Sequence, residues 1–152
     1  MKLNKIIDLK NEPYELDDLD NPDSFEGNLG HTMPDTLKAH IKKQPAKDNV
    51  WVECHGQYPA DKEYIGPLEY YPPSQGFPVD VVYRGVLDKD GKKIEPEYEA
   101  PIVAVRFAKP KKDQLLHVEC RAWARNIKYD KRDRLGINLF ELHILNSQIS
   151  NE

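Results

Sequence analysis

Side chains that could do chemistry are few in this sequence, and their spacing is irregular. None of the five histidines stands in a metal-binding pattern, such as two on one helical turn beside a glutamate: His31, His40, His55, His117 and His143. The sequence also has no Gly-x-Ser-x-Gly elbow, glycine-rich phosphate loop or nucleophilic cysteine motif. These observations predict a protein that is not an enzyme.

The two cysteines, Cys54 and Cys120, each follow a Val-Glu pair in a segment of alternating apolar residues. Both are expected at inward-facing strand positions, where a thiol behaves as a small apolar group. A buried thiol pair is the favoured interpretation, and a disulfide is the main alternative. A zinc site is disfavoured because two isolated cysteines lack the paired spacing of such sites.

Two groups of aromatic and polar residues could bind a ligand. The first comprises His31, Tyr71, Gln75 and Phe77. An aromatic ring can stack on the C–H surface of a sugar while polar side chains fix its hydroxyls. The competing interpretation is that Tyr71 and Phe77 only pack the turn of a proline-rich loop.

The second group is basic and aromatic, and it begins with Trp123, Arg125 and Asn126. With Lys128, Tyr129, Arg132 and Arg134 it could stack bases or clamp phosphates. The competing interpretation is a solvated loop with local charge pairing, because Asp130 and Asp133 alternate with the cations.

An acidic run from Asp17 to Asp23 could coordinate calcium through its carboxylates. The regular spacing of a calcium loop is missing, so a solvated acidic segment is the favoured interpretation. No other cofactor is expected.

Composition limits the remaining classes. The 152 residues fit one domain, and a net charge of -4 disfavours a nucleic-acid partner. No apolar run approaches the roughly 20 residues of a membrane span, and the first ten residues lack the apolar stretch of a secretory signal. We expect no membrane span and a cytoplasmic location, or an extracytoplasmic one if the chain is part of a larger secreted protein.

The elements that must position these residues change in character at residue 50. Residues 1–49 read as an irregular acidic arm, too poor in branched apolar residues to bury much surface, with one short helix at 36–43. Residues 50–146 read as the ordered domain and 147–152 as a tail. Within that domain, six alternating segments predict strands centred on residues 52, 69, 81, 105, 119 and 142.

Strong turn signals separate the predicted strands, and no further helix is expected among them. We therefore predict an all-β fold, an antiparallel β-sandwich of the jelly-roll type. If consecutive strands alternate in direction, the segment before Val50 and loops 72–78 and 109–114 share one end. Loops 55–63, 87–98 and 123–136 then share the other end.

Residues 50–145 also resemble discoidin-like domains, the coagulation factor type C or galactose-binding-like family, in the order of several short motifs. The chain has a Trp-led strand (Trp51 to Gly56), a strand ending in Tyr-Pro (Ile65 to Pro72), a Tyr strand (Val79 to Tyr83), Asp90-Gly91, the Arg-rich segment His117 to Ile127 and a closing Gly136 to Ile144. The Cys-His-Gly at 54–56 departs from the family's Asp-Leu-Gly. The resemblance implies a jelly roll that binds glycans through loops at one end.

The leading hypothesis is thus a non-catalytic, carbohydrate-binding module. One alternative is an intracellular protein-interaction module, of the inhibitor or immunity type, that uses its acidic arm against a basic protein partner. The second alternative is a single-stranded nucleic-acid binder, because residues 79–85, 102–108 and 117–127 are similar to strands of OB-fold proteins.

Overall fold

A computed structural model describes residues 11–21, 31–79, 90, 92 and 101–146 of the chain. In chain order its elements are the 3-10 helix η1 (Asp17–Asp20), α1 (Asp35–Lys43), β1 (Asn49–Gly56), α2 (Pro59–Tyr64), β2 (Leu68–Tyr71), β3 (Gly76–Pro78), β4 (Ala104–Phe107), β5 (Leu115–Trp123) and β6 (Ile137–His143). The fold is mostly β-sheet with few helices, as the alternating pattern predicts.

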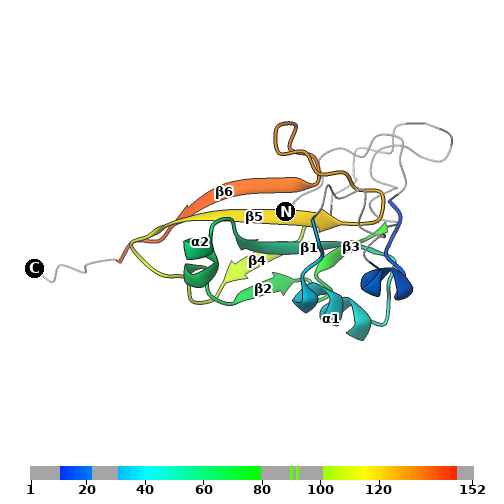
Figure 1. The fold of residues 1–152 in the computed structure, drawn as a ribbon, viewed down its shortest axis with the longest axis horizontal. Helices are drawn as coiled ribbons and strands as arrows, with labels where there is room; N and C mark the ends of the chain where they lie inside the picture. Colours follow the sequence, from blue (N-terminus) through cyan, green and yellow to red (C-terminus); the bar gives the residue numbers. More distant parts are fainter. Residues whose placement is uncertain (1–10, 22–30, 80–89, 91, 93–100, 147–152) are drawn as a thin grey trace, which may run out of the picture.

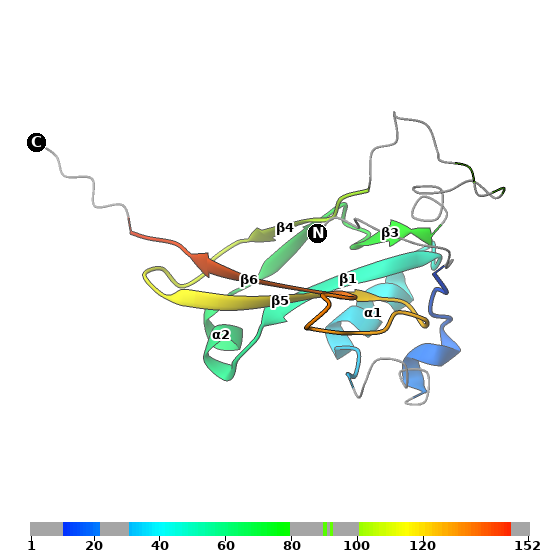
Figure 2. The same ribbon diagram turned by 90° about the horizontal axis from the view of Figure 1, so that it is seen from above.

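The described strands form two antiparallel sheets, one of four strands in the order β3-β1-β5-β6 and one of two, β2-β4 (Figures 1 and 2). These six strands are fewer than the eight of a jelly roll. In the larger sheet β1 pairs with β5 so that Trp51 faces Trp123 and Cys54 faces Cys120. Residues that face each other across two strands share a sheet face, so this register decides what each face carries.

One face of the larger sheet packs against β2 and β4. Val50, Val52, Val118 and Ala122 on this face are buried. Leu68, Tyr70, Val105 and Phe107 of the smaller sheet pack against them. Cys54 and Cys120 lie on the same face and form a disulfide across the two strands, so the expectation of a free thiol pair is wrong. Two facing strand positions bring the sulfur atoms within bonding distance.

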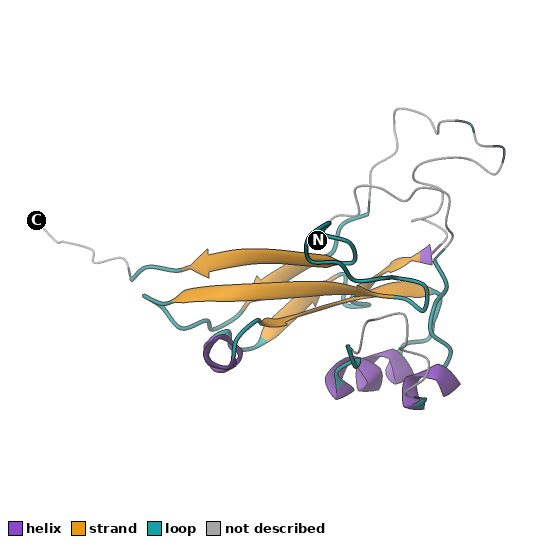
Figure 3. Ribbon diagram, turned by 45° about the horizontal axis from the view of Figure 1, so that its top comes forward, coloured by secondary structure: helices purple, strands orange, loops and turns teal. Residues whose placement is uncertain are grey.

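The opposite face of the sheet carries a second core, which the arm supplies. Trp51 and Trp123 are fully buried there. The arm residues that cover them are each at most 2% exposed: Tyr14, Leu19, Met33, Leu37 and Ile41. Figure 3 shows the helical segments of the arm together on one side of the sheet. The expectation that the arm buries little surface is therefore wrong, because widely spaced apolar residues meet one shared tryptophan pair.

Polar contacts hold the arm in place around that core. The Lys47 ammonium donates to the carbonyls of Ile41 and Gln44 and so satisfies the end of α1. Lys42 bonds the Asp20 carboxylate at 2.9 Å and thus ties α1 to η1. The α1 helix covers the region where the sequence predicts one.

The sequence predicts one short helix and misses α2. Six residues are too few to show helical periodicity, and the helix depends on its surroundings instead. Pro59 opens it, and the Asp61 carboxylate accepts the Tyr58 amide at 3.2 Å. A Cβ atom at Gly56 would lie 2.3 Å from the carbonyl carbon of Asp61, so only glycine lets α2 pack onto the end of β1.

The predicted grouping of the loops is confirmed for the segment before Val50 and loop 72–78, which meet where Asn49 pairs with Pro78. It is wrong for loops 109–114 and 123–136, because β1 and β5 are direct neighbours. The end of β1 meets the start of β5, so α2 lies beside the turn at 109–114, where the Lys111 amide donates to the Tyr64 carbonyl at 2.9 Å. At the other end, the loop after Trp123 lies with the arm, where the Arg125 amide donates to the Glu12 carbonyl at 2.8 Å.

Three predicted features fall outside the described residues: most of the strand around Val81, most of the loop 87–98 and the tail at 147–152. Among the described residues, no helix is both long and apolar enough to cross a membrane.

Removing the disulfide tests how far it holds the fold together. It closes a loop between residues separated by 66 positions, so the double variant Cys54→Ala/Cys120→Ala should lose up to about 4 kcal/mol of unfolding free energy, through the loop-closure entropy of the unfolded chain. Urea denaturation of both proteins measures this loss. A reducing agent should destabilise the wild type and leave the variant unchanged; equal stability of the two oxidised proteins would contradict the prediction.

The arm should unfold together with the sheet. Ile41→Ala removes a fully buried side chain beside Trp51, and we expect it to cost about 2–4 kcal/mol. The matched control is Lys43→Ala on the exposed side of α1, which should change stability by less than about 0.5 kcal/mol. Tryptophan fluorescence should follow one cooperative transition in all three proteins. An early, separate transition in the Ile41 variant would show an independent arm.

Candidate functional site

The sheet face beneath the arm changes from aromatic to charged along the strands. Beyond the Trp51–Trp123 pair, Glu53 faces Arg121 and His55 faces Glu119. The result is a cross-strand cluster of ionisable groups next to a fully buried core. The loop after β5 completes the cluster with Lys131.

Glu119 is the centre of this cluster. It is only 1% exposed, and its carboxylate accepts hydrogen bonds from Arg121 Nε at 2.6 Å and from Lys131 Nζ at 3.0 Å. Burial raises the pKa of Glu119, but the bonds and charges of Lys131 and Arg121 outweigh burial and leave that pKa below its ordinary value. Glu119 therefore stays ionised and fastens the loop to the sheet.

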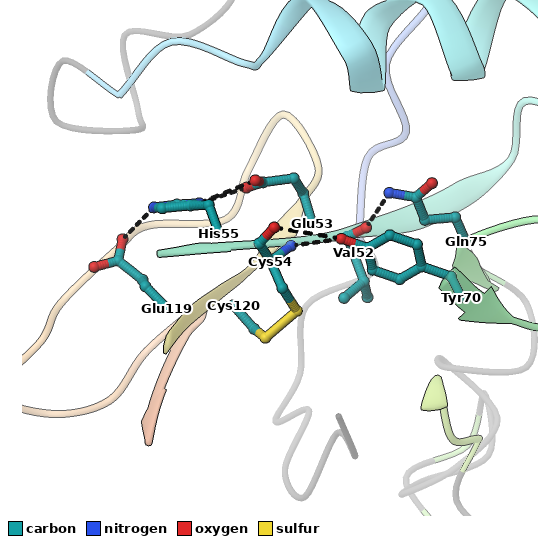
Figure 4. The surroundings of a disulfide bond; sticks show 8 residues. All are labelled: Val52, Glu53, Cys54, His55, Tyr70, Gln75, Glu119 and Cys120. Carbon is teal, nitrogen blue, oxygen red and sulfur yellow. Dashed lines mark hydrogen bonds and ion pairs between the residues drawn. A yellow bond between two sulfur atoms is a disulfide. The ribbon is translucent and has the colours of Figure 1, made fainter. Parts of the chain in front are cut away.

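His55 lies between two carboxylates, as Figure 4 shows. Its Nδ1 is 2.9 Å from Glu53 Oε1, and its Nε2 is 3.7 Å from Glu119 Oε1. A similar arrangement follows on the same face, where His117 lies 3.4 Å from the Asp61 carboxylate of α2. Beyond the aromatic pair, the face therefore carries two histidines, each next to a carboxylate.

Beyond β3, the edge of β1 is covered by side chains instead of a strand (Figure 4). The Tyr70 hydroxyl accepts the Cys54 amide at 2.9 Å, and the Gln75 side-chain amide donates to the Val52 carbonyl at 2.9 Å. Burial raises the pKa of Tyr70 to about 12, so its hydroxyl stays protonated. A cavity of about 480 Å³ opens at this edge, lined by residues of α1, β1, α2 and β2.

The first predicted binding group does not form a common surface. Phe77 is 1% exposed and belongs to the core of the larger sheet. Phe77 therefore packs in the core, as in the competing interpretation, and offers no surface to a ligand. Gln75 is bonded to the β1 backbone. Tyr71 is half exposed, and its hydroxyl donates to Glu69 at 3.1 Å.

His31 lies instead with the second predicted group. Its ring meets the edge of Tyr129 at 5.5 Å, and Tyr129 in turn meets Trp123 at 5.5 Å. Burial, with the charge of Arg121 next in importance, lowers the pKa of His31. The contact exists because the arm folds back over the sheet.

Three other members of the second group, Trp123, Arg125 and Asn126, attach the arm to the sheet. Trp123 is fully buried, so it offers no surface for stacking a base. The Asn126 side chain accepts the Glu12 amide at 3.0 Å, and the Arg125 guanidinium lies 3.7 Å from Asp18. A base-stacking surface is thus not formed by these residues.

In the acidic run of the arm, the carboxylates of Asp18 and Asp20 bind other groups of the protein. Asp20 pairs with Lys42, and the Asp18 carboxylate accepts the Glu15 amide at 2.9 Å. No group of three or more His, Cys, Asp or Glu side chains in the described part of the chain is placed to hold a metal ion.

The sequence does not single out Glu119, Lys131, Glu53 or Asp61. Alternation places Glu119 beside Arg121 on the polar side of a strand, but a polar side chain there is expected to be solvated. Its carboxylate is contacted by His55 of the neighbouring strand and by Lys131 of the loop after β5, and alternation within one strand predicts neither contact.

A family model and several relatives that match this chain all describe the same kind of subunit. The family model for the sodium/potassium ATPase beta chain matches residues 1–139. Sodium/potassium-transporting ATPase subunit beta-2 of Drosophila melanogaster is 39% identical over 149 residues, which is 95% of this chain and 41% of the relative. Subunit beta-1 of the same fly is 38% identical over 144 residues, 93% of this chain and 40% of the relative. The human subunit beta-2 is 33% identical over 101 residues, 65% of this chain and 33% of the relative.

Glu119→Gln should lower stability at neutral pH by about 2 kcal/mol, because the amide keeps the shape but loses two charge-assisted bonds. The pKa of Glu119 is lower in the folded than in the unfolded chain, so its contribution is present above its ordinary pKa and is lost as pH falls through the folded value. The difference in unfolding free energy between wild type and variant should therefore become smaller as the pH falls from about 5 to about 3.

Urea denaturation across that pH range measures the gap. Glu141→Gln is the matched control, because that side chain is 65% exposed and lies 3.9 Å from His117. We expect it to change stability by less than about 0.5 kcal/mol at every pH. A gap for Glu119→Gln that stays constant down to pH 3 would contradict the assignment.

Proposed function

Because this chain belongs to the sodium/potassium ATPase beta chain family, we propose that it acts as a non-catalytic part of such a beta subunit. Its partner is then the alpha subunit of a sodium/potassium-transporting ATPase, a membrane protein. The match of the family model from residue 1 to residue 139 carries this proposal, because it includes the arm and strands β1 to β5.

The chain spans about two-fifths of the length of the fly relatives that it matches. The activity of a whole beta subunit is therefore proposed for it as one part of such a subunit. The fold supports a positioning role, since the arm, both sheets and the disulfide form one body with two cores. A body of this kind can present loops to a partner without changing shape.

Family membership corrects several expectations. The discoidin-like resemblance is wrong, and with it the carbohydrate-binding module and the glycan as partner. The intracellular interaction module and the OB-fold nucleic-acid binder are wrong as well. The motifs misled because Trp-led strands, Tyr-Pro turns and Asp-Gly turns serve any antiparallel sheet with short connections.

We place the described domain in an oxidising, extracytoplasmic compartment. The Cys54–Cys120 disulfide supports this location, because such bonds persist where thiols are not kept reduced.

A chimeric subunit tests the proposed function. In the fly beta-2 subunit, the matched region is replaced by this chain, and the chimera is produced together with the fly alpha subunit. We expect the two to purify together from detergent and to support potassium-stimulated ATP hydrolysis. The native fly subunit is the positive control, and a fly subunit lacking the matched region is the negative control.

Failure to fold is recognised separately, because the Cys54–Cys120 bond changes the mobility of the chimera on non-reducing gels. A chimera that carries the disulfide but purifies without the alpha subunit would overturn the proposal.

A further inference from the structure

The loop that joins β5 to β6 concentrates positive charge in an acidic chain. Residues 124–136 contain five basic and two acidic side chains, which gives a net charge of +3, whereas the whole chain carries -4. The basic residues are Arg125, Lys128, Lys131, Arg132 and Arg134. The loop follows β5 at the end of the sheet that also holds the arm (Figure 1, gold and orange).

Buried contacts fix the shape of this loop. Tyr129 at its centre is 2% exposed, and its hydroxyl donates to the Ala122 carbonyl at 2.8 Å. Gly136 has a φ of +65°, and a Cβ there would lie 2.7 Å from the Tyr129 ring, so glycine allows the loop to close tightly. Asp130 and Leu135 exchange backbone hydrogen bonds of 3.1 and 2.9 Å across the tip.

Internal bonds use one of the two carboxylates of the loop. Asp130 Oδ1 accepts the amides of Arg132 at 2.8 Å and Asp133 at 3.0 Å. The Asp130 carboxylate therefore also fixes the turn. Together with Asp133 it offsets two of the five basic charges and leaves the loop with its net charge of +3.

The cations of the loop fall into two classes. Lys131 forms an ion pair with Glu119, and Arg125 lies 3.7 Å from Asp18, so both side chains stabilise the fold. Lys128, Arg132 and Arg134 are exposed, and none of their side chains makes an ion pair or hydrogen bond with the described residues. Leu135 beside them is 53% exposed. A loop with a fixed backbone thus presents three exposed cations and a half-exposed leucine.

We propose that this loop, residues 124–136, is a docking surface for an acidic segment of another polypeptide. The loop is already ordered, so binding there costs little conformational entropy. Opposite charges steer the partner to the loop, and an apolar residue of the partner packs on Leu135. A flexible acidic segment can place its carboxylates on Lys128, Arg132 and Arg134 and away from Asp133, whereas a uniformly anionic membrane surface would meet Asp133 with like charge.

The inference goes beyond the proposed function, since the docking surface is defined by this chain alone. Its test uses the isolated chain and a fluorescein-labelled poly-glutamate peptide. Fluorescence anisotropy at about 0.15 M salt gives the dissociation constant, and rising salt should weaken the complex. Backbone amide shifts in NMR spectra should change at residues 124–136.

The test variant is Lys128→Glu/Arg132→Glu, which reverses two exposed charges and removes no internal contact. We expect its affinity for the peptide to fall about tenfold or more. The matched control is Lys109→Glu/Lys112→Glu, which makes the same change of charge at exposed positions of the turn before β5, at the opposite end of that strand. Its affinity should fall less than about twofold.

Equal losses in the two double variants would overturn the proposal, because binding would then depend on net charge alone. Absence of peptide binding by the wild type would overturn it too. So would binding to phosphatidylserine vesicles without binding to the peptide, which would make the loop a lipid contact. None of these outcomes depends on whether the chimeric subunit assembles with the alpha subunit.

Discussion

The tryptophan pair Trp51–Trp123 is the contact on which the rest of the structure depends. The two indoles lie side by side on neighbouring strands and are fully buried. They can be buried only because the arm covers them, so the sheet has a core on both faces. Each large aromatic side chain buries about 150–250 Å², which makes this pair the main reason for the arm to stay folded.

The second core also explains why a cluster of ions is stable next to it. Glu119 lies on the charged part of the face, beyond the Glu53–Arg121 pair, and Arg121 and Lys131 satisfy its carboxylate. Without such partners, a buried carboxylate would take up a proton or would destabilise the fold around it. Because Lys131 belongs to the loop after β5, the same bond that neutralises Glu119 also holds the loop in position.

This loop therefore combines buried anchors with exposed charge. Tyr129 and Gly136 fix its backbone, while Lys128, Arg132 and Arg134 point to its exposed surface without partners among the described residues. Within a subunit of a larger assembly, such a loop can recognise a partner at small entropic cost. The division of roles within one loop follows from which side chains reach the second core.

The sequence misses β3, because Gly76–Pro78 lies in a segment predicted as a loop. It predicts β1 and β5 with their inward faces, because alternation at Val50, Val52 and Cys54, or at Leu116, Val118 and Cys120, is a local property of an extended chain. It also located α1, whose Leu37 and Ile41 are four residues apart. It did not determine the family, the disulfide or the role of the arm. Tyr14, Leu19 and Met33 are too far apart to form a pattern, and only the tertiary structure gathers them on Trp51 and Trp123. Burial of Glu119 and the position of His31 were decided in the same way, because both depend on contacts between segments that are distant in sequence.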